Sequence, residues 1–491
     1  MKQIKEYHPD QSFFLHFNPE QYFKPNSLEM IISNIFEKHI NIEDFIKKMK
    51  NEKRGQKEYH PKLLLKIIFY SYTTGVFSSR EMENNLHNHL AYIFLASGAI
   101  LDHSTICRFI HKYRKQIEDV FSKVLYICWK LKLLNLEMVA LDGTKIRSNA
   151  SGTFTGNRKQ FTTMQERLKK QIQKLMERQN RVDQKEASEE YKLEQQKKID
   201  RQKKKYENAL DKIDFFLNEI DDNKVKYNIT DLDCRLQKGE NGKYFEGYNA
   251  QAVASDKVIL SCNLTNHQSD RNELSSMMER TDKQLSELGY QKEELEKIQR
   301  LADAGYRNSE QIGNLVEKNY DMYVRLPASS NQETSKTIGT KECELLEKNG
   351  EYILKCPGGR DLTTCGPRNE DGNMVYKFFA SRKDCHELNC PYLDKCVGKQ
   401  KKGSKKFSIK QEVVENYNLV KSMQLKMNTI EGKDVYNQRI GMIERVFGLI
   451  KSTLGFRRFY HRGLEKVSLI WKMVCTAYNI RKIFTMGLEI V

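Results

Sequence analysis

The sequence predicts an α/β protein with a mixed five-stranded sheet and flanking helices, preceded by an all-helical segment. Apolar residues recur at helical spacing from about residue 27 to 134, with almost no proline. Strand-like and helix-like runs then alternate from residue 136 to 326, the order of a mixed α/β domain. Because 491 residues exceed one simple core, we expect two domains, 1–134 and 135–491.

The composition is that of a globular protein with a basic excess. Lys and Arg total 83 against 65 Asp and Glu, a formal charge of +18. Such an excess predicts a polyanionic partner, and nucleic acid is the commonest one. The alternative is a basic surface that is only solvated.

No targeting or membrane segment is expected. The start, MKQIKEYHPDQSFFLHF, has no apolar stretch followed by a small-residue cleavage site. No run of about 18 apolar residues occurs, so we expect a cytoplasmic protein with no membrane partner. Eleven cysteines in a reducing compartment are expected to be free thiols, and clustering among them would indicate metal binding.

The first expected domain, 1–134, contains a basic and aromatic helix. Asp102 offers an N-cap to a helix through Arg108, Phe109 and Tyr113. This pattern is typical of the recognition helix of a helix-turn-helix motif, which would make the domain a DNA-binding one. A packed helix with a solvated basic face fits the same spacing.

The first strand is predicted at 136–146, an apolar run that reaches Asp142 and Gly143. A buried strand there would present Asp142 at its end. A plain Asp-Gly turn is the alternative.

The segment 150–226 interrupts the α/β order and is dominated by Lys, Arg, Glu and Gln. Its sparse apolar residues predict two antiparallel helices or a short coiled coil, without catalytic chemistry of their own. We interpret it as a helical insertion, with contact to DNA as a further option.

Strand signals return after this segment. Residues 244–254 and 257–265 would pair as a hairpin, and the polar break 267–270 would cap a following helix. A short strand within 298–306 carries Asp303 near its end, and a last strand follows at 321–326.

A second interruption, 329–410, is rich in turn-forming residues and cysteines. Four residues separate Cys385 from Cys390 and five separate Cys390 from Cys396. These gaps are wider than the spacing of the cysteine pairs in a zinc ribbon. Reduced thiols in a loop are the alternative to a structural zinc ion. The candidate ligands are Cys356, Cys385, Cys390 and Cys396, with Cys365 or His386 as substitutes.

Helical spacing returns after Lys406, and Glu444 lies at the edge of an apolar helical stripe with Lys451 seven residues on. A helix that fixes a carboxylate at its margin suits a metal ligand, although a solvated Glu fits as well. A further segment interleaves cations with aromatics, as a DNA-gripping surface or as a basic loop at a helix end. Its cations are Arg457, Arg458, His461 and Arg462.

Together these motifs resemble the DDE transposases of bacterial insertion sequences, over nearly the whole chain. The resemblance is to the branch with a helical amino-terminal domain and a cysteine-bearing insertion before the final acid. It implies an RNase H-like catalytic domain, in which acid-bearing strand ends lie side by side. The matching stretches are Asp142-Gly143-Thr144, Gly247-Tyr248-Asn249-Ala250-Gln251, Ala302-Asp303-Ala304-Gly305-Tyr306 and the series Tyr436, Arg439, Glu444, Lys451.

The resemblance implies a metal-binding triad of Asp142, Asp303 and Glu444, with two Mg²⁺ (or Mn²⁺) ions as cofactors. Carboxylates suit such hard cations, which would activate the attacking oxygen and stabilise the leaving oxygen. Tyr436, Arg439 and Lys451 match positions that contact DNA phosphates. Four residues separate Arg439 from Glu444, whereas the best-known form of the signature has three.

The implied reaction is hydrolysis at the transposon ends, followed by attack of the freed 3′-hydroxyl on target DNA. The implied partners are double-stranded DNA, as terminal inverted repeats and target, and a second copy of the chain in a DNA-bound homodimer. The implied location is the bacterial cytoplasm, in association with the nucleoid. The rival interpretations are a nuclease of the same fold without strand transfer and a DNA-binding protein that has lost catalysis.

Overall fold

The computed structural model describes residues 18–49, 58–184, 188–219, 225–239, 241–325, 338–348, 350–387, 389–397 and 404–488. The chain divides into two compact units. The first comprises Met1–Leu131 with Met473–Val491, and the second comprises Lys132–Lys472. No described helix is long and apolar enough to cross a membrane.

The first unit is helical among its described residues and is centred on α4 (Pro61–Thr73). Eleven of the 13 residues of α4 are buried, as expected for a helix surrounded by others. The surrounding elements are α1 (Pro19–Tyr22), α2 (Leu28–Asn34), the π-helix η1 (Ile35–His39), α3 (Glu43–Lys48), α5 (Ser79–Asn88), α6 (Leu90–Leu95), α7 (His103–Lys112) and α8 (Arg114–Lys130).

Helix α7 is the basic and aromatic helix that the sequence predicts. The Asp102 carboxylate accepts a hydrogen bond from Thr105 N at 2.6 Å, which satisfies a free amide of the first turn. Ile106, Phe109 and Ile110 are buried. Packing therefore explains its apolar face, and Arg108 lies on the exposed side.

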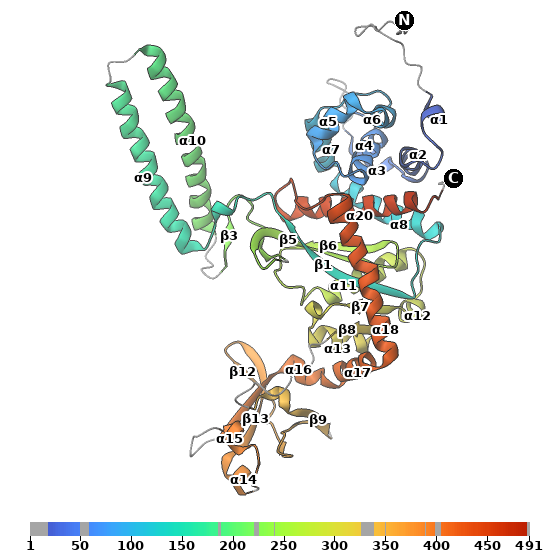
Figure 1. Cartoon of the computed structure of the whole chain (residues 1–491), viewed down its shortest axis with the longest axis vertical. Helices are drawn as coiled ribbons and strands as arrows, with labels where there is room; N and C mark the ends of the chain where they lie inside the picture. The colour runs from blue at the N-terminus through green and yellow to red at the C-terminus, as the bar shows by residue number, and fades with distance from the viewer. Residues whose placement is uncertain are drawn as a thin grey trace, which may run out of the picture. The chain divides into compact units, whose positions relative to one another are not determined.

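The second unit contains a mixed six-stranded sheet (Figure 1). β1 pairs antiparallel with β5 and parallel with β7, and β7 pairs parallel with β8. Both β4 and β6 pair antiparallel with β5. The strands are β1 (Met138–Arg147), β4 (Arg235–Lys238), β5 (Tyr244–Ala254), β6 (Ile259–Thr265), β7 (Gln299–Ala302) and β8 (Asp321–Val324).

Three details of this sheet differ from the sequence prediction. β4 is a sixth strand, which was missed because it is short and mostly polar. Asp142 lies inside β1 and not at its end, because the second half of β1 pairs with β5 as far as Arg147 opposite Gly247. The helix expected to be capped by residues 267–270 begins only at Leu274.

Helices pack on both the central and the edge strands. α11 contacts β5 and β6, and α18 contacts β7 and β8. Trp471 of α20 (Leu464–Thr485) donates its indole N–H to Gln251 O of β5 at 3.1 Å. The flanking helices of this unit are α11 (Leu274–Glu287), α12 (Lys292–Leu295), α13 (Ser309–Glu317), α17 (Tyr417–Asn428) and α18 (Ile430–Arg439).

Two long helices, α9 (Arg158–Asp183) and α10 (Glu189–Glu219), pack along each other as a hairpin (Figure 1). Phe161 and Phe216 meet near its base at 4.7 Å between ring centroids. The two-stranded sheet of β2 (Thr155–Gly156) and β3 (Tyr227–Asn228) joins the segments that enter and leave the hairpin. A 3₁₀ turn, η2 (Gly152–Phe154), precedes β2.

The cysteine-bearing segment contains more regular structure than its turn-rich sequence predicts. It forms two three-stranded sheets with a core of their own, which includes Leu354, Phe378 and Phe407. Its elements are η4 (Thr340–Glu342), β9 (Glu344–Lys348), β10 (Glu351–Lys355), β11 (Asp361–Leu362), β12 (Pro367–Glu370), β13 (Asn373–Ser381), α14 (Arg382–Glu387), α15 (Leu393–Val397), β14 (Ser404–Lys410) and α16 (Gln411–Glu415).

Candidate active site

The register of the sheet brings Asp142 and Asp303 together. Leu141 of β1 pairs with Ala302, the last residue of the parallel strand β7. The residue after Leu141 is Asp142 and the residue after Ala302 is Asp303, so the two aspartates lie side by side, one within β1 and the other directly after β7. Asp303 then caps the 3₁₀ turn η3 (Ala304–Tyr306), its carboxylate accepting from Gly305 N at 2.7 Å.

The surroundings of Asp142 disfavour the charged form of its carboxyl group. Burial, above all, raises the pKa of its carboxyl to about 6, and the neighbouring carboxylates of Asp303 and Asp270 add to the increase. Hydrogen bonding from Gly143 N at 2.8 Å and the Arg439 guanidinium oppose it. Neighbouring carboxylates repel one another, and a divalent cation bound between them would relieve that repulsion.

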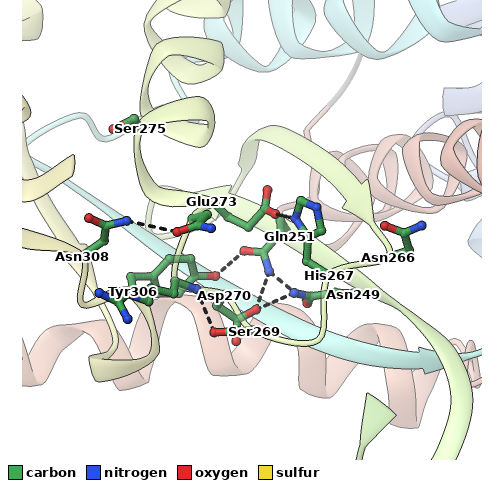
Figure 2. Close-up of polar contacts among 12 residues, drawn as sticks. Asn249, Gln251, Asn266, His267, Ser269, Asp270, Glu273, Ser275, Tyr306 and Asn308 are labelled. Carbon is green, nitrogen blue, oxygen red and sulfur yellow. Dashed lines mark hydrogen bonds and ion pairs between the residues drawn. The ribbon is translucent and has the colours of Figure 1, made fainter. Parts of the chain in front are cut away.

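Asp270 is a third acid at this place, and the sequence prediction missed it. One of its oxygens accepts three hydrogen bonds: from Lys145 Nζ at 3.0 Å, Asn249 Nδ2 at 2.6 Å and Gln251 Nε2 at 2.7 Å. Figure 2 shows Asn249, Gln251 and Asp270 joined in this way. The only signal was a polar break after β6, which we interpreted as a helix cap.

Three buried side chains of the motifs Gly247–Gln251 and Ala302–Tyr306 form a frame for the site: Asn249, Gln251 and Tyr306. The Tyr306 hydroxyl donates to Gln251 Oε1, and Gln251 also donates to Asn249 Oδ1 at 2.9 Å (Figure 2). Asn249 and Gln251 are fully buried, so their amides have no water to bind and depend on these partners. The frame therefore fixes Asp270 beside the aspartate pair.

Gly143 explains why the strand carries Asp-Gly at its centre. A Cβ at this position would lie 2.3 Å from Gln251 Nε2 and 2.8 Å from Asp270 Oδ1. The glycine thus allows the close approach of β1 to the frame and does not form the turn that we kept as an alternative.

Glu444 lies on a helix that changes its winding. α18 continues into the π-helix η5 (Ile440–Glu444), then α19 (Arg445–Gly448) and a second π-helix, η6 (Leu449–Thr453). Met442 and Ile443 are buried and η5 packs on β1 and β5, whereas Glu444 is exposed. Among the described residues, no three His, Cys, Asp or Glu side chains are already placed to hold one metal ion.

The π-helix accounts for the unusual spacing between Arg439 and Glu444. In a π-turn each N–H bonds to the carbonyl five residues earlier, so one turn takes up more residues than an α-helical turn. A π-turn over Ile440–Glu444 would therefore take up the extra residue and keep Arg439 and Glu444 near one side of the helix.

Arg439 and Tyr436, the expected phosphate contacts, lie beside the acids. Arg439 Nη1 is 3.4 Å from Asp142 Oδ2 and the Arg439 side chain is only 11% exposed. Its Nε is buried without a hydrogen-bond partner. Tyr436 lies under the same guanidinium at 5.8 Å, and burial, with the Asp303 charge, raises the pKa of Tyr436.

The basic segment, residues 457–462, is hydrogen-bonded to the end of β1 and to the residues that follow it. Phe459 N donates to Arg147 O at 2.8 Å, and Arg458 and Arg462 both donate to Asn149, at 3.0 and 2.7 Å. Arg457 donates to Lys451 O at 2.9 Å. Arg147 is itself exposed and adds a cation that the sequence prediction missed. His461 is half-buried.

The four candidate zinc ligands lie in the cysteine-bearing segment and line one cavity, whereas Cys365 and His386 are exposed. All described cysteines are free thiols.

Comparison with known proteins adds two family matches. Residues 355–484 match the family described as Transposase DDE domain, and residues 17–112 match the family described as Transposase domain (DUF772). The first match includes the cysteine-bearing segment and Glu444, while Asp142 and Asp303 precede it. No curated protein and no solved structure matches the chain.

Proposed function

Because the chain belongs to the DDE transposases of the insertion-sequence type, we propose that it cuts DNA at the ends of an insertion sequence and joins those ends to target DNA. A transposase acts on DNA, so DNA is the substrate. The observation that carries the proposal is the placement of Asp142 next to Asp303 at the end of the parallel pair β1 and β7.

The proposed cofactors are two Mg²⁺ or Mn²⁺ ions. The donor set fits them, because Asp142 and Asp303 offer hard oxygens whose mutual repulsion a cation would relieve. Bound divalent ions supply activation of the attacking oxygen and stabilisation of the leaving oxygen. We assign Asp142, Asp303 and Glu444 as the ligands, within an RNase H-like sheet, which the strand order β6-β5-β1-β7-β8 supports.

The chain's other residues hold the acids and the DNA. Asp270 positions Lys145 at the site through their 3.0 Å ion pair. Arg439 neutralises Asp142 and is released to a DNA phosphate when the carboxylates take up cations. Tyr436 and Lys451 complete this phosphate contact, and the exposed guanidinium groups of the basic segment supply affinity for the duplex.

The proposal extends to the organisation of the protein. The helical domain 1–134 binds DNA, and 135–491 is the catalytic domain with its insertions at 150–226 and 329–410. The terminal inverted repeats are bound by a homodimer, in the cytoplasm and on the nucleoid.

The test is cleavage of a duplex that carries the DNA flanking the gene, in Mg²⁺, by Asp142→Asn, Asp303→Asn and Glu444→Gln. Loss of one metal ligand removes several kcal/mol of transition-state stabilisation, so cleavage should fall by about a thousandfold or more. DNA affinity should stay within about threefold, since phosphate contacts provide it.

Asp256→Asn, in the exposed turn after β5, is the matched control and should cleave normally. Wild-type cleavage by any of the three site variants would refute the assignment. A second assay with pre-cut ends separates the rival: a nuclease would release ends and never join them to target DNA.

A further inference from the structure

Four cysteines from separate elements line one small cavity in the cysteine-bearing segment. Cys356 follows β10, Cys385 lies in α14, Cys390 precedes α15 and Cys396 lies in α15. The cavity volume is about 10 Å³, close to that of a single water-sized sphere. The space therefore suits one ion.

Only some of the described cysteines of the segment line the cavity. Cys365 is exposed and does not line it, and neither does His386. The apolar side chains of Ile338, Ala380 and Leu393 form part of the wall. These side chains would keep water away from metal–thiolate bonds.

The backbone around Cys356 is shaped to bring thiols together. Cys356 N donates to Arg360 O and Gly359 N donates to Cys356 O, both at 2.9 Å, which forms a tight turn between β10 and β11. A Cβ at Gly358 would lie 2.7 Å from Cys390 Sγ and 3.7 Å from Cys356 Sγ. Only glycine lets the turn approach the Cys390 thiol so closely.

A cation already faces one of the sulfurs. Arg360 Nη1 donates to Cys385 Sγ at 3.4 Å. The arginine would thus offset part of the negative charge of a four-thiolate site.

The segment also has a physical need for a cross-link. It has its own apolar core, but the stretch 338–415 is shorter than the roughly 80 residues below which a small unit usually requires a disulfide or a metal. One ion held by all four thiols would tie the β10–β11 turn to α14 and α15.

We infer that Cys356, Cys385, Cys390 and Cys396 bind one structural zinc ion. Thiolates select zinc or iron over magnesium, and four thiolates around one ion are the ligand set of a structural zinc site. The described thiols are not yet arranged as ligands around one point. Binding therefore requires the four side chains to rotate toward the cavity, with loss of their protons.

The test measures metal in the full chain, expressed with zinc and purified without chelators. Elemental analysis should find about one zinc ion per chain, the stoichiometry of a four-cysteine structural site. Cys390→Ser and Cys356→Ser should lose most of it, whereas the matched control Cys365→Ser should keep it.

A thiol-labelling experiment on the wild-type chain covers the case in which the variants do not fold. Cys356, Cys385, Cys390 and Cys396 should resist alkylation until a zinc chelator is added, while Cys365 reacts at once. Wild-type protein without zinc, zinc retained by Cys390→Ser, bound iron in its place, or disulfides among the four would each overturn the inference. None of these results bears on the aspartate site, because the readout is metal content and not DNA cleavage.

Discussion

Asp142 is a mostly buried carboxyl whose charged form is destabilised by its surroundings. Its side chain is 20% exposed and lies beside two further carboxylates. The Asp142 carboxyl has a pKa of about 6 in the folded chain, above its ordinary value near 3.8. The folded state therefore binds more protons than the unfolded state between about pH 4 and 6, and its stability falls as pH rises through that window.

Asp142→Asn should stabilise the chelator-treated protein at pH 7, because the amide resembles the protonated carboxyl. The gain should reach at most about 3 kcal/mol, from about 1.4 kcal/mol for each unit of pKa. It should vanish below about pH 4, where the carboxyl is protonated in both states. Thermal unfolding with chelator at both pH values measures it, with exposed Asp256→Asn as the control; a variant less stable than wild type at pH 7 would contradict the electrostatic account.

Sequence patterns predicted that Asp142 and Asp303 lie together, because each of these two acids came with a local signal. Asp142 and Asp303 follow apolar runs, and parallel neighbours place such positions together. Asp270 had no such signal, since its partners Lys145, Asn249 and Gln251 lie 125, 21 and 19 residues away. Only the folded sheet shows that these side chains meet.

At the scale of elements, the helix that carries Glu444 combines two windings. An ordinary α-helix turns about 100° per residue, so one added residue would carry Glu444 away from Arg439. The π-turn at Ile440–Glu444 avoids that rotation. The sequence revealed the odd spacing but not its resolution, because the apolar stripe is compatible with either winding.

Deletion of Gly441 should convert the π-turn to α-helix and keep Arg439 and Glu444 on one side. Cleavage should then stay within about tenfold of wild type, because three residues would separate Arg439 from Glu444, the i, i+4 relation of neighbours on an α-helix. Insertion of one Ala after Gly441 should abolish cleavage, because nothing remains to absorb a rotation of about 100°. Circular dichroism must show both variants folded. Equal cleavage activity in the deletion and insertion variants would contradict the proposal that the π-turn compensates for the extra residue between Arg439 and Glu444.

The extents of β1 and β4 could not be predicted from the sequence pattern of nearby residues alone. Thr144 and Ile146 of β1 are buried while Lys145 and Arg147 are more exposed, the alternation of a strand, yet the preceding Asp-Gly pair is typical of a turn. Pairing with β5 makes these residues a strand and not a turn, and β5 lies about a hundred residues later in the sequence. β4 was missed for the same reason, since its polar residues become a strand only beside β5.

At the scale of the whole molecule, the charge of +18 and the exposed cations near the end of β1 predict binding that weakens steeply with salt. The logarithm of affinity for duplex DNA should fall linearly with the logarithm of salt concentration. Arg458→Ala should reduce that slope by about 1, the value for one lost phosphate contact. The control is Lys292→Ala, which removes an exposed lysine paired with Glu296 at 3.6 Å and should leave the slope unchanged. A slope equal to wild type in Arg458→Ala would remove the basic segment from the DNA contact.

The α9–α10 hairpin sets a length scale for the protein. α9 has 26 residues, and at 1.5 Å per residue it extends about 39 Å, longer than the roughly 35 Å of one full turn of a DNA duplex. A tilt of about 10° at its base would move its far end by about 7 Å over that length. Because Phe161 of α9 packs on Phe216 of α10 near this base, loss of that contact would separate the two helices there, and the displacement would grow toward the far end of the hairpin.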